Sequence, residues 1–234
     1  MRHPLIYILL LLSSLTCTAS VEVKYSVTSK SRQNLVSDVK SKKENQQYQD
    51  IVAMMDKNSN KNYQLVVEGT TSSFSPIKPE KQIADHDPEI IIISNDYSDE
   101  ERSTFLNLQT KQKTEVINFL MKNYIVRDTL ASLPWTLQDG EKDIMGLKCY
   151  RACIGDSVTA WYCMEIPISQ GPEGYWGLPG IILDLETPTA FYQCLSIDTQ
   201  SKEKPEKERS GKEMTREGFK HFQAETIRML KERR

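Results

Sequence analysis

The sequence contains little histidine: three in 234 residues, namely His3, His86 and His221. Because they lie in unrelated segments, a Ser-His-Asp or Cys-His catalytic site is hard to build. Asp85, His86 and Asp87 are three potential metal ligands, but consecutive side chains point apart and cannot easily converge on one ion. A solvated turn is the better interpretation, so we predict no metal site and no cofactor.

Catalytic motifs are also missing. The chain has no Gly-x-Ser-x-Gly elbow, no phosphate-binding glycine-rich loop and no His-Glu-x-x-His helix. Glu165, Asp184 and Glu186 could still converge in space as a carboxylate pair. However, Asp184 and Glu186 fall on one side of a predicted strand and Leu183 and Leu185 on the other, which is typical of a solvent-facing row. A secreted hydrolase with a carboxylate-based site therefore stays an alternative to the non-enzymatic prediction.

Neither an excess of one charge nor a long apolar run is present. The formal net charge is −2, and it becomes −3 if the N-terminal 19 residues, with their single arginine, are removed. A surface without a strong positive field is a poor match for nucleic acid. No segment approaches the roughly twenty apolar residues that a transmembrane helix needs, so we predict no membrane span.

The N-terminus has the pattern of a secretory signal peptide over residues 1–19. Arg2 supplies the positive start, Leu5–Leu15 the short apolar core, and Cys17-Thr18-Ala19 a small-residue cleavage site. Acylation of Cys17 as a lipoprotein is an alternative, but Ser14-Leu15-Thr16 is a poor lipobox. We predict export to the periplasm or the cell surface.

The remaining residues, 20–234, are enough for one domain with a real core. Residues 200–213 are charged and predict a surface linker, and residues 214–231 predict an amphipathic helix, with capping-box spacing at Ser210 and Glu213. Thr70 to Pro79 is rich in Ser, Thr and Pro, which predicts a loop. Strands are expected at Val21–Thr28, Tyr63–Glu68, Thr104–Leu108, Thr114–Leu120, Lys122–Val126, Ile144–Arg151, Val158–Ile166, Ile181–Leu185 and Ala190–Ile197.

These short sequential strands predict a mainly β (α+β) fold: a single curved antiparallel sheet. The curvature could extend to a half-barrel. We expect the C-terminal amphipathic helix to pack against the concave face and close the core.

Four cysteines would remain after cleavage, and an even number in an exported chain favours two disulfides. Three connectivities are possible for Cys149, Cys153, Cys163 and Cys194. A hairpin turning at Gly155-Asp156-Ser157 would place Cys149 opposite Cys163.

The most distinctive stretch is Gly177-Leu178-Pro179-Gly180-Ile181-Ile182. Together with residues 165–176 it places four glycines and three prolines between two apolar runs. Such residues specify backbone shape and bring no nucleophile, base or metal ligand.

Several blocks of sequence resemble the GLPGLI family of envelope proteins from Bacteroidota, although Ile181-Ile182 stands where the family motif has Leu-Ile. The blocks are Ile144–Cys149, Ala160–Tyr162, Glu165–Ser169, Gly171-Pro172 and Gly177–Gly180, and the likeness is concentrated between about Trp135 and Ile197. The resemblance implies an envelope protein without an established biochemical activity. It also suggests that Cys149 and Cys194 belong to the family pattern, which favours a Cys149–Cys194 disulfide and leaves Cys153 with Cys163.

Four residues near this stretch are candidates for binding: Trp161, Glu165, Tyr175 and Trp176. We expect the Glu165 carboxylate to accept backbone donors from the Gly177–Gly180 turn, and Trp161 to pack in the core. The aromatic rings suit a groove for an apolar ligand or an envelope protein. The leading hypothesis is a non-enzymatic binding or accessory protein of the cell envelope, and a purely structural envelope protein is a further alternative.

Overall fold

The polypeptide is organised around one large β-sheet in the computed structural model, which describes residues 20–30, 60–77, 101–207 and 210–232. Twelve strands follow the order β12-β6-β5-β4-β3-β2-β1-β11-β10-β9-β8-β7, so β12 and β7 are the two edges. The strands are β1 (Ser20–Ser29), β2 (Asn60–Glu68), β3 (Thr71–Pro76), β4 (Arg102–Asn107), β5 (Gln112–Phe119), β6 (Lys122–Thr129), β7 (Thr136–Ile144), β8 (Leu147–Ile154), β9 (Val158–Cys163), β10 (Ile181–Glu186), β11 (Ala190–Ser201) and β12 (Lys212–Met214).

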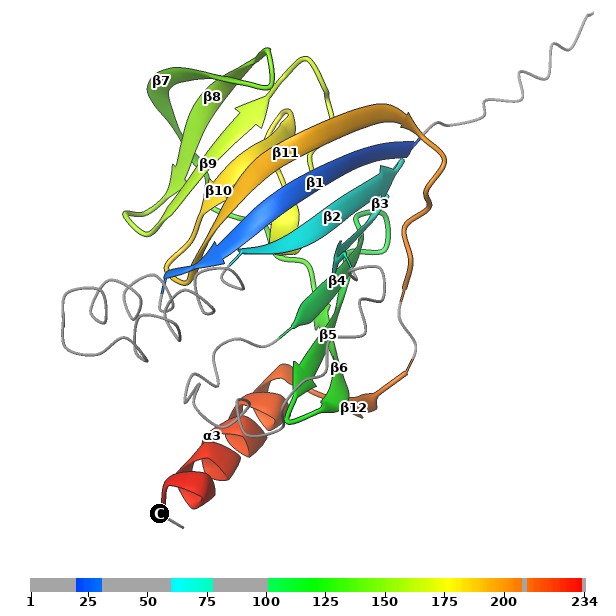
Figure 1. Cartoon of the computed structure of the whole chain (residues 1–234), viewed down its shortest axis with the longest axis vertical. Helices are drawn as coiled ribbons and strands as arrows, with labels where there is room; N and C mark the ends of the chain where they lie inside the picture. The colour runs from blue at the N-terminus through cyan, green and yellow to red at the C-terminus, as the bar shows by residue number, and fades with distance from the viewer. Residues whose placement is uncertain (1–19, 31–59, 78–100, 208–209, 233–234) are drawn as a thin grey trace, which may run out of the picture.

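The sheet bends strongly along its length, as Figure 1 shows. Its strands are antiparallel to their neighbours, except that β12 runs parallel to β6. One helix, α3 (Arg216–Glu232), follows β12. The predicted mainly β fold with a curved sheet and a C-terminal helix is therefore confirmed, and the sheet is open rather than closed into a barrel.

Most strands were predictable from their alternation, but β3, β7 and β12 were not. β12 (Lys212–Met214) begins inside the segment predicted as a surface linker. The prediction of a loop from Thr70 to Pro79 is wrong, because β3 pairs with both β2 and β4. Phe74 supplies its core anchor by stacking on Tyr63, with ring centroids 4.9 Å apart. The edge strand β7 was missed because all its residues except Ile144 are exposed, which leaves no apolar alternation to detect.

The main core lies on the inner face of the β1–β3 and β8–β11 strands. It includes Tyr25, Leu65, Phe74, Ile182, Leu185 and Tyr192, all buried. At the other end, α3 packs on a second cluster made by Ile117, Phe119, Tyr124, Val126 and Phe219. The helix therefore covers the β5–β6 end of the sheet and not the whole concave face (Figure 1).

The start of α3 also differs from the prediction. Thr215 caps it, because its Oγ1 accepts the backbone N–H of Gly218 at 3.1 Å. The predicted capping pair, Ser210 and Glu213, does not cap the helix, because Glu213 belongs to β12. Within the described residues no helix combines the length and apolarity needed to cross a membrane. The predicted signal peptide and the Asp85–Asp87 segment lie outside the described residues.

Candidate functional site

Residues 164–180, which we call the motif loop, connect β9 to β10. Hydrogen bonds between its own backbone groups close the loop. Its end is also tied to β1, because the Tyr25 hydroxyl donates to the Ile182 carbonyl at 2.6 Å. Three backbone hydrogen bonds span the loop: the N–H of Gly177 donates to the Ser169 carbonyl (2.8 Å), that of Ile181 to the Ile166 carbonyl (3.0 Å) and that of Ile182 to the Gln170 carbonyl (3.2 Å). Two shorter-range bonds join Ile168 to Ile166 and Tyr175 to Pro172.

Gly180 is required by close packing of the backbone. A Cβ atom at this position would lie 2.0 Å from the Cys163 carbonyl oxygen and 2.8 Å from the Met164 nitrogen. Gly177 is required for a different reason, since its φ of 101° lies in the left-handed region that favours glycine. The glycines of the motif thus fix the path of the chain between β9 and β10.

The middle of the motif loop crosses the concave side of the sheet. Its short 3₁₀ turn, η2 (Pro172–Gly174), reaches β4 and β5, where the Lys113 ammonium donates to the Glu173 carbonyl at 3.4 Å. From the opposite side, the Tyr192 hydroxyl on β11 donates to the Glu173 carboxylate. The loop therefore links strands that are separated in the sheet by β3, β2 and β1.

The predicted apolar groove would lie where Glu173 bonds to β5 and β11. Burial, reinforced by the Glu173 carboxylate, raises the pKa of the Tyr192 phenol far above its ordinary value. Tyr192 therefore stays protonated and keeps donating to Glu173 at any physiological pH. The motif loop acts as a brace across the curve of the sheet.

Three aromatic residues sit at the margin of this brace: Trp135, Tyr175 and Trp176, which we call the aromatic rim. The Trp135 indole N–H donates to the Trp176 carbonyl at 2.8 Å, and its ring lies 6.2 Å from that of Tyr175. Trp135 and Tyr175 pack against the main core, whereas all three rings keep some exposure. Trp135 was not among the predicted site residues, although an isolated tryptophan next to a loop signals that its N–H needs a partner.

The other two candidates lie elsewhere. Glu165 is exposed and accepts the Lys148 backbone N–H at 3.4 Å, so the expectation that it would cap the Gly177–Gly180 turn is wrong. The Gly177 N–H of this turn donates to the Ser169 carbonyl instead. Trp161 is half-buried, touching the main core while its ring lies 5.8 Å from the Lys142 ammonium. The structure therefore brings together only Tyr175 and Trp176 of the four candidates.

Of the three carboxylates considered for a catalytic pair, Asp184 and Glu186 each pair with a lysine ammonium. Asp184 pairs with Lys142 at 2.5 Å and also accepts the Cys194 backbone N–H at 3.0 Å. Glu186 is exposed and pairs with Lys30 at 2.7 Å. Both lie on the outer side of β10, opposite buried Leu185, as the alternation predicted.

The four cysteines among the described residues have free thiols, so the predicted Cys149–Cys194 and Cys153–Cys163 disulfides are wrong. The β8–β9 hairpin pairs Cys149 with Cys163 and Cys153 with Thr159. Cys153 is thus about 13 Å along the ladder from Cys163, beyond the reach of a disulfide. Strands β9 and β10 separate Cys149 from Cys194. Burial is the main cause that raises the pKa of the Cys149 and Cys194 thiols to about 12.

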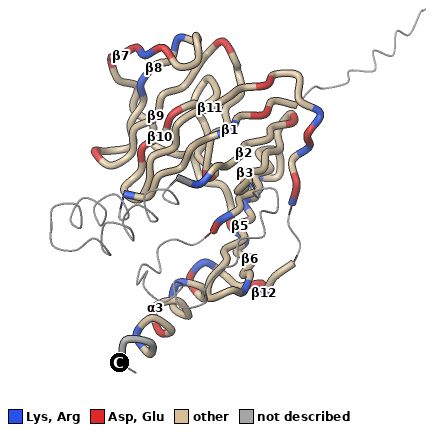
Figure 2. The backbone as a smooth tube through the Cα atoms, viewed as in Figure 1, with Lys and Arg blue, Asp and Glu red and all other residues tan. Residues whose placement is uncertain are grey.

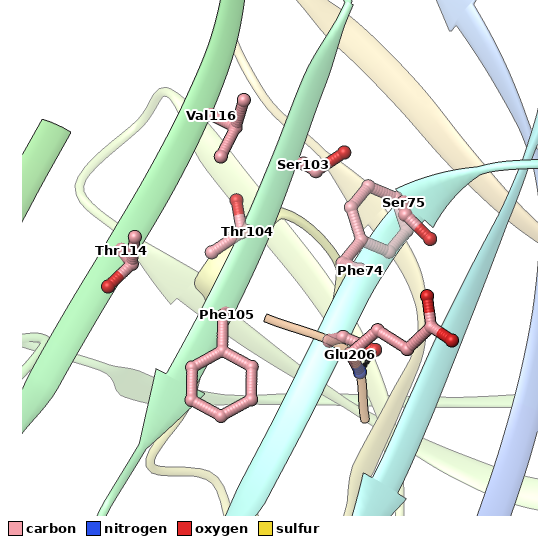
Figure 3. A pocket seen from close by; sticks show the side chains of 9 residues that line it. Phe74, Ser75, Ser103, Thr104, Phe105, Thr114, Val116 and Glu206 are labelled. Atoms are coloured by element: carbon pink, nitrogen blue, oxygen red, sulfur yellow. Dashed lines mark hydrogen bonds between the residues drawn. The ribbon is translucent and has the colours of Figure 1, made fainter. Parts of the chain in front are cut away.

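The outer side of the β3–β5 strands carries a shallow depression (Figure 3). Its floor holds short hydroxyl side chains, and the segment after β11 crosses it, where the Glu206 backbone N–H donates to the Ser73 hydroxyl at 3.2 Å. The lining residues are Ser73, Phe74, Ser75, Ser103, Thr104, Phe105, Thr114, Val116 and Glu206. The depression is too small to take more than water-sized groups.

Charged side chains and potential metal-binding side chains are dispersed over the described structure. Figure 2 shows lysine and arginine interspersed with aspartate and glutamate along the described part of the backbone. Among the described residues no group of three His, Cys, Asp or Glu side chains could hold a metal ion. His221 is exposed on α3.

Residues 155–184, which run from the β8–β9 turn through the motif loop into β10, match a family described as "Protein of unknown function (Porph_ging)". This family corresponds to the GLPGLI-type envelope family of Bacteroidota. The resemblance to the GLPGLI family is confirmed. The matched segment contains Gly180, which packs closely against the Cys163 backbone, and Glu173, which bonds to Lys113 and Tyr192. It also contains Tyr175 and Trp176 of the aromatic rim. No curated protein matches the chain.

Proposed function

We propose that this chain is an exported binding or accessory protein of the cell envelope, without catalytic activity of its own, and that the aromatic rim makes the contact. The observation that carries this proposal is the fixed placement of partly exposed rings on and beside a braced loop. Trp176 is held through its carbonyl by Trp135 and through an isolated bridge to Gln170. Rings that are ordered before binding lose little entropy when a ligand arrives.

The position of β1 supports the export part of the proposal. β1 begins at Ser20, directly after the expected cleavage site, and the Ser20 hydroxyl donates to the Ser201 carbonyl at 2.8 Å. A chain cleaved after Ala19 would therefore begin with a residue that already belongs to the sheet. The occupant of the rim would be an apolar ligand or another envelope protein, because aromatic side chains supply large contact areas with few rotatable bonds.

The test combines location and binding in one preparation. We expect the protein to fractionate with the envelope and to begin at Ser20 by N-terminal sequencing. Chemical cross-linking in the intact envelope, followed by mass spectrometry, should then recover a reproducible partner or lipid with the wild-type chain. Trp176→Ala should reduce that recovery about tenfold, the effect of losing a 1.4 kcal/mol contact.

Leu195→Ala is the matched control, since Leu195 is also an exposed apolar residue (47%) but lies on β11 outside the motif loop. Equal recovery from wild type, Trp176→Ala and Leu195→Ala would contradict the role of the rim. Recovery of the full-length, uncleaved chain from the cytoplasm would contradict export.

A further inference from the structure

The turn between β5 and β6 places two large apolar side chains in water. Leu120 is 47% exposed and Met121 is 94% exposed. Phe119 pairs with Lys122 at the end of the hairpin, so Leu120 and Met121 are the two central residues of a two-residue loop. The Met121 side chain therefore gains almost nothing from the core.

The backbone of this turn is unfavourable for the residues that occupy it. The φ angles of Leu120 and Met121 are 50° and 62°, both in the left-handed region. Two-residue hairpin loops with positive φ at both positions favour Asn-Gly, because these residues adopt that conformation at little cost. Backbone strain of this kind concentrates where a side chain serves a contact. The strained turn therefore indicates that the two apolar side chains are themselves required there.

Helix α3 brings further apolar surface to the same end of the molecule (Figure 1). It runs from the level of Glu115, which pairs with Arg216, to that of Phe119, whose ring lies 6.0 Å from that of Phe222. Met229, two helical turns beyond Phe222 on the same face, is 51% exposed. We call Leu120, Met121 and Met229 the apolar tip.

Three lysines lie around the apolar tip. Lys122 directly follows Met121, Lys212 on β12 pairs with Tyr124 on β6, and Lys220 belongs to the first half of α3. All three side chains are exposed, and none forms an ion pair with another described residue. Their charges are therefore available to a partner.

The carboxylates at this end of the molecule are engaged with other cations. On α3, Glu225 and Glu232 lie 3.8 and 4.0 Å from Arg228. Glu101, just before β4, pairs with Lys61 at 3.9 Å. The apolar tip thus carries a local excess of positive charge, although the whole chain has a formal net charge of −2.

We propose that the apolar tip inserts into the surface of an anionic lipid bilayer. A protruding apolar pair needs a partner into which it can sink, and a bilayer accepts a protrusion without a matching pocket. The ammonium groups of the lysines would meet lipid phosphates while their methylene chains lie at the apolar boundary.

The same charges disfavour a second copy of this chain as the occupant. A symmetric contact between two tips would place their lysines against each other, which is repulsive. The bilayer contact goes beyond the proposed function, because it uses neither the motif loop nor the aromatic rim.

The test measures co-sedimentation of residues 20–234 with lipid vesicles. These residues contain every described strand and α3, whereas the apolar segment Leu5–Leu15 would itself enter a bilayer. We expect vesicles of phosphatidylcholine with roughly 30% phosphatidylglycerol to bind the protein at least about tenfold more strongly than pure phosphatidylcholine. Raising the salt from about 0.1 to 0.5 M should remove this preference.

The decisive variant is the double substitution Leu120→Asn with Met121→Gly. It introduces the residues that the turn favours, so the Tm should rise by about 4 °C. Vesicle binding should nevertheless fall at least about tenfold, because the inserted side chains are gone. A more stable protein that binds less cannot owe its loss of binding to misfolding.

Two single variants complete the test. Lys122→Gln should weaken binding to the anionic vesicles about fivefold. Leu195→Asn is the matched control, because Leu195 is as exposed as Leu120 (47%) but lies on β11, and it should bind as wild type does.

Equal binding of wild type and the double variant to anionic vesicles would overturn the proposal, and so would absence of binding by wild type. Dimerisation that the double variant abolishes, without vesicle binding, would assign the tip to a second copy and also overturn it. Vesicle binding that is lost in Trp176→Ala but kept in the double variant would overturn it while supporting the aromatic rim, so the two proposals can fail separately.

Discussion

Gly180→Ala should destabilise the folded protein by at least about 3 kcal/mol, because the added methyl group meets backbone atoms that cannot move aside alone. The Cβ would lie 2.0 Å from the Cys163 carbonyl oxygen, at the end of β9. Relief requires β9 and β10 to separate where the motif loop closes. For a chain of this size, the loss corresponds to a Tm lower by about 6–12 °C.

Gly155→Ala is the control that separates this steric clash from the cost of placing alanine in a left-handed backbone conformation. Gly155 has a φ of 53°, but a Cβ there would meet nothing within 4 Å. Alanine at this position should cost only about 1 kcal/mol, the penalty for a left-handed conformation. Melting curves that give the two variants the same Tm would contradict the steric account of the motif.

Glu115→Gln should remove a large part of the protein's stability at neutral pH and weaken the attachment of α3. Glu115 is buried, yet its carboxylate contacts both Lys113 and Arg216 at 2.6 Å. Burial alone would raise its pKa; Lys113 and Arg216 together outweigh burial and lower the pKa from 4.5 to about 2. Such a shift corresponds to roughly 3 kcal/mol, and Arg216 is the first residue of α3.

The pH dependence has a definite direction. Because the pKa of Glu115 is lower in the folded state, its contribution is complete above pH 4.5 and is lost as the pH falls from about 4.5 to 2. Urea unfolding of wild type and Glu115→Gln at pH 7 should therefore differ by about 3 kcal/mol, and the difference should shrink towards pH 2. Arg228→Ala, which removes only an exposed charge on α3, should change the free energy of unfolding by less than about 0.5 kcal/mol. A difference that stays constant with pH would contradict the role of the ionised carboxylate.

The sequence predicted the fold best where one face of a strand is buried. β1 and β10 alternate apolar and polar residues, and both lie where that pattern places them. β3 could not be predicted because serine and threonine favour turns locally, whereas pairing on both sides overrides that preference. β7 is exposed along nearly its whole length, so only its hydrogen bonds to β8 define it.

The candidate site was predictable in composition but not in arrangement. The glycines of the motif correctly indicated backbone shape, yet nothing local indicates that Glu173 would bond to Tyr192 and Lys113, which come from distant strands. The cysteines were predicted in part. The hairpin turn at Gly155-Asp156-Ser157 correctly placed Cys149 opposite Cys163, whereas the even number of cysteines wrongly suggested disulfides.

The central claim is that the motif loop is a fixed brace across the sheet, and native-state amide hydrogen exchange tests it most directly. The amides to follow are those of Gly177, Ile181 and Ile182, which donate to carbonyls within the motif loop. We predict that they exchange as slowly as the β1 amides that pair with β2 and β11, because both would require opening of the same structure. Exchange as fast as that of the exposed Gly155–Ser157 turn would show that the loop opens on its own, and would contradict the account.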